Sequence, residues 1–212
     1  MPTTPRSGLP VFSVTRLAKV LVGEQPCLLE PWLSGHFKFD KVNRDPNSLA
    51  TWKINHTELL SKVTEQYLSD GWKPQVEQFF RVTGVVAVLN GKVDLIVKKP
   101  DCRPKIVDAK TGEVRESDVV QVAIEMIALP MAWGVHMTFD GEVVYPTHTV
   151  PVRQADADRI RPALFKLLKH LALDSRPAAS PGEGACRFCE VPASECPDRF
   201  VPETAIATTM EF

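Results

Sequence analysis

Four short runs rich in β-branched and apolar residues follow one another between residues 76 and 110 and constrain the fold of this chain most. They are VEQFFRV (76–82), VVAVL (85–89), KVDLIV (92–97) and KIVDAK (105–110). This composition favours β-strands, and Asn90-Gly91 between two of the runs predicts a β-hairpin. Helical patterns precede and follow the block. The order of helix, strands, helix, strand pair and helix predicts an α/β fold with a mixed central sheet flanked by helices.

Apolar residues recur at helical spacing in several segments outside this block. The segments are 13–23, 54–71, 118–131 and 155–173. His56 is expected in the first turn of the second segment, and the third should end near Pro130. Residues 43–50 are typical of a turn-rich connection. Asp140-Gly141 predicts a second hairpin, formed by the residues on either side of it.

The length of 212 residues suits one well-packed domain with an appended segment. We expect a loose, Pro-rich tail at residues 1–12, the domain at 13–175, and a linker with a cysteine-rich segment at 176–212. No stretch approaches the roughly 20 apolar residues of a membrane helix, and the N-terminus lacks the order of a signal peptide. We therefore expect a cytoplasmic protein that does not contact a membrane.

The net charge of −1 does not by itself indicate a nucleic-acid-binding protein, so any such contact needs a local basic patch. Two basic stretches are candidates, although solvated surfaces explain them equally well. They are Lys98, Lys99, Arg103 and Lys105, and Arg153, Arg159, Arg161, Lys166 and Lys169. The four tryptophans are candidates for base stacking, with core or rim packing as the more frequent role.

An acid in the middle of one predicted strand and an acid and a lysine on the next form the main candidate site. Asp108 and Lys110 are two residues apart, so they share one face of their strand. Pairing of the two strands would bring Asp94 alongside Asp108, where two carboxylates repel unless a cation lies between them. Their oxygens suit Mg²⁺ or Mn²⁺. The alternative is that these are ordinary polar residues at strand edges.

This arrangement resembles the active site of the PD-(D/E)xK nuclease superfamily, and the RecB-like branch in particular. That branch adds a His on an earlier helix and a Gln on the following one, for which His56 and Gln121 are in the matching places. Glu125 stands where the branch usually has a Tyr, and Val93 replaces the motif's leading Pro. Surface roles for His56 and Gln121 remain alternatives.

The resemblance implies metal-dependent hydrolysis of DNA phosphodiesters and a role for each matching residue. Asp94, Asp108, Lys110 and Gln121 would be catalytic, and His56, Asp94 and Asp108 would hold the metal.

Five cysteines in a chain without an export signal favour metal ligation or buried thiols over disulfides. Cys186, Cys189 and Cys196 form a C-x₂-C-x₆-C pattern, and Cys27 is the candidate fourth ligand. Cys102, in a polar loop, is expected to be an unligated thiol. By ligand chemistry alone, Zn²⁺ fits four cysteines as well as an iron–sulfur cluster does.

One cysteine before the core and three after it resembles the iron–sulfur RecB-like exonucleases, which include CRISPR-associated enzymes and the nuclease domain of AddB-type helicase subunits. Their C-x₄-W segment is similar to Cys27 to Trp32. The resemblance implies a 4Fe-4S lobe that joins the N- and C-terminal segments. It also implies single-stranded DNA ends as substrate, in CRISPR spacer acquisition or DNA repair. The alternatives are an adaptor that docks DNA onto an integrase or helicase partner without turnover, and a zinc-stapled structural subunit.

Overall fold

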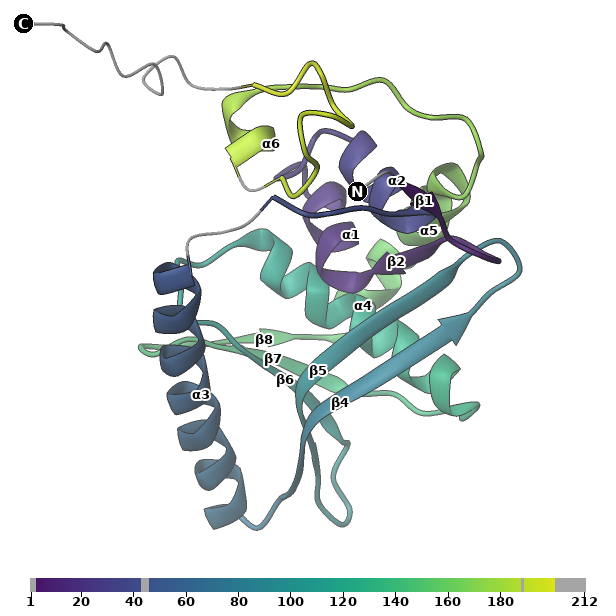
Figure 1. Ribbon diagram of the computed structural model, residues 1–212. Helices are drawn as coiled ribbons and strands as arrows, with labels where there is room; N and C mark the ends of the chain where they lie inside the picture. Colours follow the sequence, from purple (N-terminus) through teal and green to yellow (C-terminus); the bar gives the residue numbers. More distant parts are fainter. Residues whose placement is uncertain (1–2, 43–45, 188, 201–212) are drawn as a thin grey trace, which may run out of the picture.

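A computed structural model describes residues 3–42, 46–187 and 189–200 of the chain (Figure 1). The helices are α1 (Val14–Leu21), α2 (Leu29–His36), α3 (Pro46–Ser69), α4 (Glu116–Trp133), α5 (Gln154–Leu171) and α6 (Glu183–Arg187). The strands are β1 (Thr4–Pro5), β2 (Val11–Ser13), β3 (Phe37–Lys38), β4 (Lys73–Thr83), β5 (Val88–Lys98), β6 (Lys105–Ala109), β7 (Asp140–Val144) and β8 (Thr149–Val152).

Six of the strands form one mixed sheet, in the order β2-β5-β6-β7-β8 with β4 paired to β5. The pairs β2–β5 and β6–β7 are parallel, and the pairs β4–β5, β5–β6 and β7–β8 are antiparallel. The remaining strands, β1 and β3, pair with each other. The predicted α/β fold with a mixed sheet flanked by helices is therefore confirmed.

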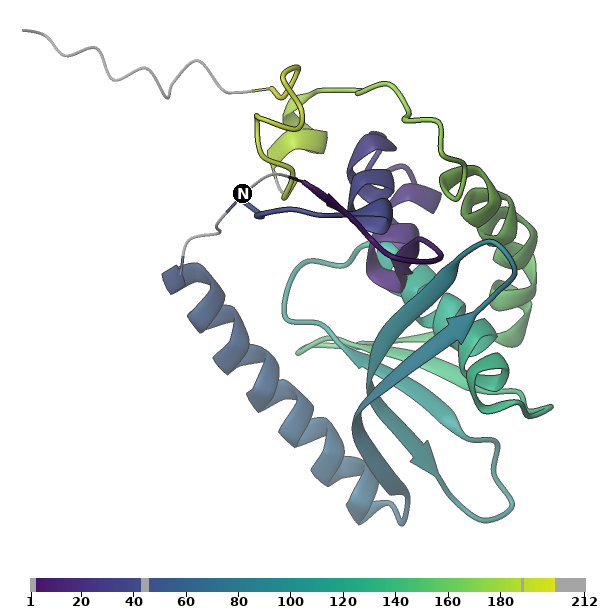
Figure 2. The same ribbon diagram turned by 45° about the vertical axis from the view of Figure 1, so that its right-hand side comes forward.

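One edge of β5 is shared between two partners. β2 pairs with β5 at Val88 to Asn90, and β6 pairs with it at Leu95 to Val97. In the described chain, residues 91–94 have no strand partner on this edge. Figures 1 and 2 show the long β4–β5 hairpin curving away from β6, β7 and β8 at this place. We call it the sheet fork, formed by residues 91–94 of β5 and 108–110 at the end of β6.

Helices cover the sheet on both sides of the fork. On one side α4 is buried along most of its length, and it packs with α1 and α5 in the main hydrophobic core. On the other side, Leu60 and Val63 of α3 pack against alternate residues of β5 and β6 in a second, smaller cluster. Burial of each such side chain stabilises the fold by roughly 1.5–3 kcal/mol. The fork thus lies between two helices that are fixed by apolar contacts.

Both predicted hairpin turns are wrong, because packing outweighs the local turn preference. Asn90 and Gly91 lie inside β5, where a Cβ atom on Gly91 would come within 2.6 Å of the Phe80 ring. The β4–β5 connection is instead closed by the Gly84 amide, which donates to the Ala87 carbonyl at 2.9 Å.

The residues of the second expected turn, Asp140 and Gly141, begin β7. A Cβ atom on Gly141 would lie 2.6 Å from Val122 of α4. In both places the glycine allows a close approach of a neighbouring side chain and is not part of a turn.

Three further expectations need correction. The helix that carries His56 begins at Pro46, so His56 lies well inside it and part of the expected connection at 43–50 is helical. α4 continues past Pro130 to Trp133 and ends at Gly134 in the left-handed conformation. The expected loose tail contains β1 and β2, since backbone pairing fixes residues 4–5 and 11–13.

None of the helices in the described ranges combines the length and the apolar character that crossing a membrane requires.

Candidate active site

Asp94 and Asp108 come together at the sheet fork because the residues next to them are paired. Leu95 lies opposite Val107 in the β5–β6 ladder, and the aspartates are the next residue on each strand toward the fork. Asp94 Oδ2 accepts a hydrogen bond from the Ala109 amide at 3.0 Å, and it lies 3.1 Å from His56 Nε2. Both aspartates are buried, with exposed fractions of 6% and 1%. A carboxylate therefore takes the place of a strand partner at this point.

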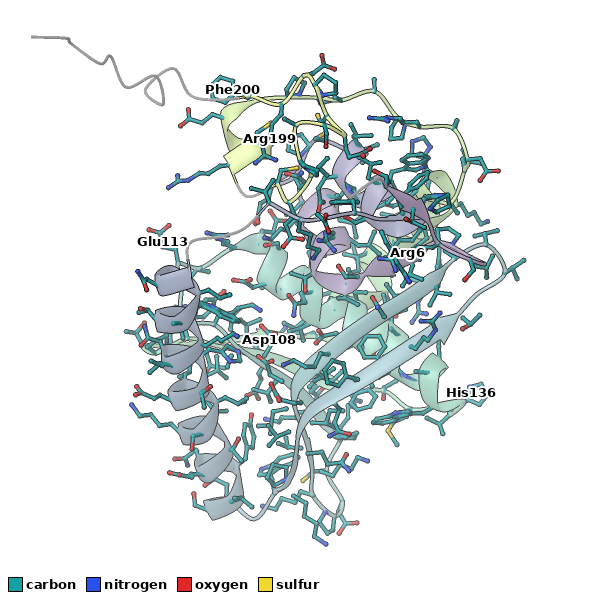
Figure 3. The ribbon with its side chains drawn as sticks, viewed as in Figure 1. Arg6, Asp108, Glu113, His136, Arg199 and Phe200 are labelled. Carbon is teal, nitrogen blue, oxygen red and sulfur yellow. The ribbon has the colours of Figure 1, made fainter. Side chains whose placement is uncertain are left out.

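Lys110 and Gln121 surround Asp108. Lys110 Nζ lies 2.6 Å from Asp108 Oδ2, and the Gln121 amide nitrogen donates to Asp108 Oδ1 at 2.9 Å. Lys110 Nζ also donates to Gln121 Oε1 at 3.5 Å. Figure 3 shows Asp108 inside the molecule, between α3 and α4. The structure thus brings together all five residues that the sequence indicated for this site.

The two aspartates differ in their electrostatic surroundings. Burial acts to raise the pKa of Asp94, but hydrogen bonds from His56 and the Ala109 amide outweigh it, so this pKa is lower than usual. Burial raises the pKa of Asp108 to about 6, even though Lys110 opposes the shift. For Lys110, burial acts to lower the pKa, but the charge of Asp108 outweighs it and the pKa lies above its usual value. Lys110 therefore stays an ammonium ion at neutral pH.

His56 connects the site to the molecular surface. Its hydrogen bond with Asp94 raises its pKa. One turn earlier on α3, the ring of Trp52 lies 5.2 Å from the His56 ring, with 30° between the planes. Trp52 is 51% exposed. An exposed aromatic ring thus lies beside the histidine that contacts Asp94.

Glu125, Asp118 and Tyr145 also belong to the site, although the sequence did not single out any of them as functional. Glu125 Oε1 accepts a hydrogen bond from the Gln121 amide at 3.3 Å. The Tyr145 hydroxyl donates to Asp118 Oδ2 at 2.9 Å. Tyr145 directly follows Val144, whose carbonyl accepts a hydrogen bond from the Lys110 amide. A signal for two of them was present: residues 118, 121 and 125 repeat at helical spacing and form a polar stripe on an otherwise apolar helix.

Negative charge exceeds positive charge in this network. Four carboxyl groups act electrostatically on Lys110, and besides Lys110 the network holds His56 as a second potential cation. The four are Asp94, Asp108, Asp118 and Glu125. A divalent cation relieves such repulsion, and carboxylate oxygens are the donors that Mg²⁺ and Mn²⁺ prefer. The donor set therefore fits these metals.

The side chains as they stand are not arranged around an ion. In the described parts of the chain, no three His, Cys, Asp or Glu side chains have the spacing of ligands to one metal. Lys110 and Gln121 contact the oxygens of Asp108, and His56 contacts Asp94. Binding of a cation would thus require these contacts to rearrange.

Four of the five cysteines line a single cavity. They are Cys27, Cys186, Cys189 and Cys196. Three of them come from the segment around α6, which lies at the top of Figure 1. The Ser180 amide donates to Cys27 Sγ and the Phe200 amide to Cys186 Sγ, both at 3.4 Å. The fifth cysteine, Cys102, is exposed and does not line this cavity. The structure thus groups the cysteines as the sequence pattern did.

The two predicted basic patches are partly neutralised by acidic neighbours. Lys105 pairs with Glu142 at 2.5 Å, and Arg103 pairs with Asp140 at 3.1 Å. On α5, Arg159 pairs with Asp156 at 3.0 Å. These contacts favour the solvated-surface interpretation for a part of each stretch.

Two buried carboxylates beside a protonated lysine form a site whose chemistry fits metal-dependent hydrolysis. The sequence model of the PD-(D/E)XK nuclease superfamily matches residues 38–197. Because this range is most of the chain, the chain belongs to that superfamily. Its members are metal-dependent nucleases, a class of hydrolases, and in general they use Mg²⁺ or Mn²⁺.

Other comparisons add little to this assignment. No curated protein matches the chain. Among the solved structures that match, one titled "Crystal structure of SSO0001" is 14% identical with a TM-score of 0.45, and the match covers 87% of this chain and 85% of that one.

We predict that the buried carboxyl group of Glu125 lowers the stability of the folded protein at neutral pH. Burial raises the pKa of Glu125 well above its usual value, and the charge of Asp108 adds to the effect. A carboxyl with a higher pKa in the folded state contributes stability below its unfolded pKa and loses it as the pH rises through the folded pKa. Because Glu125→Met removes this group, the variant should be more stable than the wild type at pH 7, by roughly 1–3 kcal/mol.

Urea unfolding of metal-free protein between pH 4 and pH 8 measures this difference, which should shrink toward pH 4. Glu125→Gln is the matched control that removes the charge and keeps the polar shape. A Glu125→Met variant that is less stable than the wild type at pH 7 would contradict the interpretation.

Proposed function

We propose that this nuclease hydrolyses DNA, as an exonuclease that acts on single-stranded ends. Asp94, Asp108, Lys110 and Gln121 are its catalytic residues, and His56 joins the two aspartates in holding Mg²⁺ or Mn²⁺. The observation that carries the proposal is the pair of buried aspartates at the sheet fork, with Lys110 2.6 Å from the more deeply buried one.

In the reaction, the oxygen of a water molecule bonds to phosphorus while the bond from phosphorus to the leaving ester oxygen breaks. The attacking water gives up a proton, and the leaving oxygen keeps the bonding electrons and takes up a proton. When bound, the divalent cation polarises the phosphate and lowers the pKa of the attacking water. Lys110 donates hydrogen bonds to the negative charge that develops on the phosphate, a role that suits a lysine held in its protonated state. Gln121 orients Lys110 through its carbonyl oxygen.

Lys110→Ala should lower the rate of DNA cleavage by about 100-fold or more, because a preorganised donor in the transition state contributes that much. The measurement is cleavage of end-labelled single-stranded DNA with Mg²⁺ or Mn²⁺, and the product ladder of the wild type gives the polarity. Lys73→Ala is the matched control, since Lys73 is exposed at the start of β4 and belongs to neither basic stretch.

Wild-type cleavage that survives in Lys110→Ala would contradict the assignment of the site. If the wild type binds DNA and cuts none of it under either metal, the adaptor function takes the place of the enzyme.

Trp52 supports the preference for single-stranded ends. One face of its ring lies near His56, and half of the side chain is exposed. A free aromatic face stacks on an unpaired base, which a base inside a duplex cannot offer. A strand end that stacked on Trp52 would lie beside the histidine that contacts Asp94.

Trp52→Ala should weaken binding of single-stranded DNA while binding of blunt duplex changes little. The loss of one stacked base, worth about 1–3 kcal/mol, corresponds to roughly a 5- to 150-fold increase in Kd. Fluorescence anisotropy with a labelled oligonucleotide measures it, in Ca²⁺ to prevent cleavage. Trp133→Ala is the control, because Trp133 is also exposed and lies at the far end of α4. Equal effects of the two substitutions would argue against stacking at Trp52.

The cysteine cavity would hold a 4Fe-4S cluster. Its four thiols come from both ends of the described chain, and three of them are buried. Backbone amides already donate to two of the sulfurs, as they do to cluster ligands. The cavity between the sulfurs has a volume of only about 10 Å³, so the thiols would have to move apart to hold a cluster. The family resemblance favours the cluster over Zn²⁺, and it also suggests CRISPR spacer acquisition or DNA repair with an integrase or helicase partner.

Cys196→Ser should abolish the cluster, whereas Cys102→Ser should leave it intact. Anaerobically purified protein would be assayed for iron, acid-labile sulfide and visible absorption. Four irons and four sulfides per chain in the wild type and in Cys102→Ser are the expected result. One zinc per chain without sulfide would support the structural zinc site instead.

A further inference from the structure

Glu125 is as deeply buried as Asp108, the more buried aspartate of the candidate site. It is 1% exposed and lies one turn after Gln121 on α4. Its Oε1 accepts from the Gln121 amide, and its Oε2 has no hydrogen-bond partner among the residues that the structure describes. A buried polar group with an unmet oxygen costs stability, so a function has to account for its presence. None of the proposed catalytic or metal-binding residues of the site is Glu125.

The contacts of Gln121 show what Glu125 can do. A glutamine amide has two N–H donors on one side and a carbonyl acceptor on the other, and the two sides have nearly the same shape. Here the nitrogen donates to two carboxyl oxygens, to Asp108 Oδ1 at 2.9 Å and to Glu125 Oε1 at 3.3 Å. With both acceptors on the nitrogen side, the carbonyl oxygen must face Lys110 Nζ, 3.5 Å away. Asp108 alone would satisfy only one of the two donors.

We propose that Glu125 is a positioning residue: by accepting the second N–H of Gln121, it fixes the amide with its oxygen toward Lys110 and thereby holds the ammonium group beside Asp108. This inference rests on the proposed function of Lys110 and Gln121. Because Glu125 lies beneath Gln121 and away from solvent, it acts through Gln121 and does not touch the DNA.

The proposed role requires the acceptor oxygen of Glu125 and does not require its charge. Glu125→Gln retains a carbonyl oxygen that can accept from Gln121, whereas Glu125→Met has a similar length and no acceptor. A positioning residue therefore tolerates the first substitution and not the second. A carboxylate that bound the metal directly would tolerate neither.

The first test does not depend on activity. In the ¹⁵N–¹H spectrum of the metal-free protein, the side-chain amide of Gln121 is assigned by its loss in Gln121→Met. Both of its protons should exchange slowly with water in the wild type and in Glu125→Gln. In Glu125→Met one of them should move upfield and exchange fast. Unchanged protons in Glu125→Met overturn the proposal, even if the wild type cleaves no DNA.

The second test is a double-mutant cycle on cleavage of single-stranded DNA with Mn²⁺. Glu125→Met should lower kcat by roughly 3- to 10-fold, the effect of one net hydrogen bond, with little change in KM. The kcat of Glu125→Gln should remain within about 2-fold of the wild-type value. In a Gln121→Met background, Glu125→Met should have no further effect.

Three results overturn the proposal: losses that multiply in the double variant, a kcat of Glu125→Met equal to that of the wild type, or a loss of Mn²⁺ affinity by calorimetry in Glu125→Gln. The last would make Glu125 a metal ligand. If neither wild type nor variants cleave DNA, the proposed function fails and the amide spectrum alone decides the role of Glu125.

Discussion

The interruption of the ladder on one edge of β5 is the constraint on which the candidate site depends. β2 and β6 share this edge and leave residues 91–94 without a strand partner there. The backbone amide of Ala109 would be unpaired at such a gap, and the carboxylate of Asp94 accepts its hydrogen bond instead. A buried carboxylate is therefore part of the sheet's own hydrogen bonding. This fixes Asp94 next to Asp108 before any metal or substrate is present.

The helices turn this pair of acids into an asymmetric site. From α3, His56 donates to Asp94 and lowers the pKa of that carboxyl, whereas Asp108 lies under α4 and has its pKa raised by burial. The polar stripe on α4 adds Glu125, whose pKa burial raises well above its usual value. The fold therefore keeps a buried carboxyl group whose ionised form is disfavoured, as expected where stability is exchanged for function.

Much of this arrangement could be predicted from residue patterns, and the failures have physical causes. Strand alternation placed Asp108 and Lys110 on one face, and a family resemblance supplied His56 and Gln121. Glu125 was noted only as a departure from the usual residue, because the helical repeat of 118, 121 and 125 has no meaning until the buried face of α4 is known. Asn90-Gly91 predicted a turn, but the Phe80 ring occupies the space beside Gly91. Local signals cannot report such long-range packing.

The cysteine cavity and the sheet fork are connected through the segment between α1 and α2. Glu24 accepts hydrogen bonds from the amide and hydroxyl of Ser117, at 3.1 and 2.7 Å, and so anchors the first turn of α4. Three residues later, Cys27 lines the cavity. A cluster that held Cys27 would therefore also restrain Glu24 and the start of α4. Because Gln121 lies one turn further along α4, a cluster distant from the fork would still stabilise the geometry of Asp108 and Lys110.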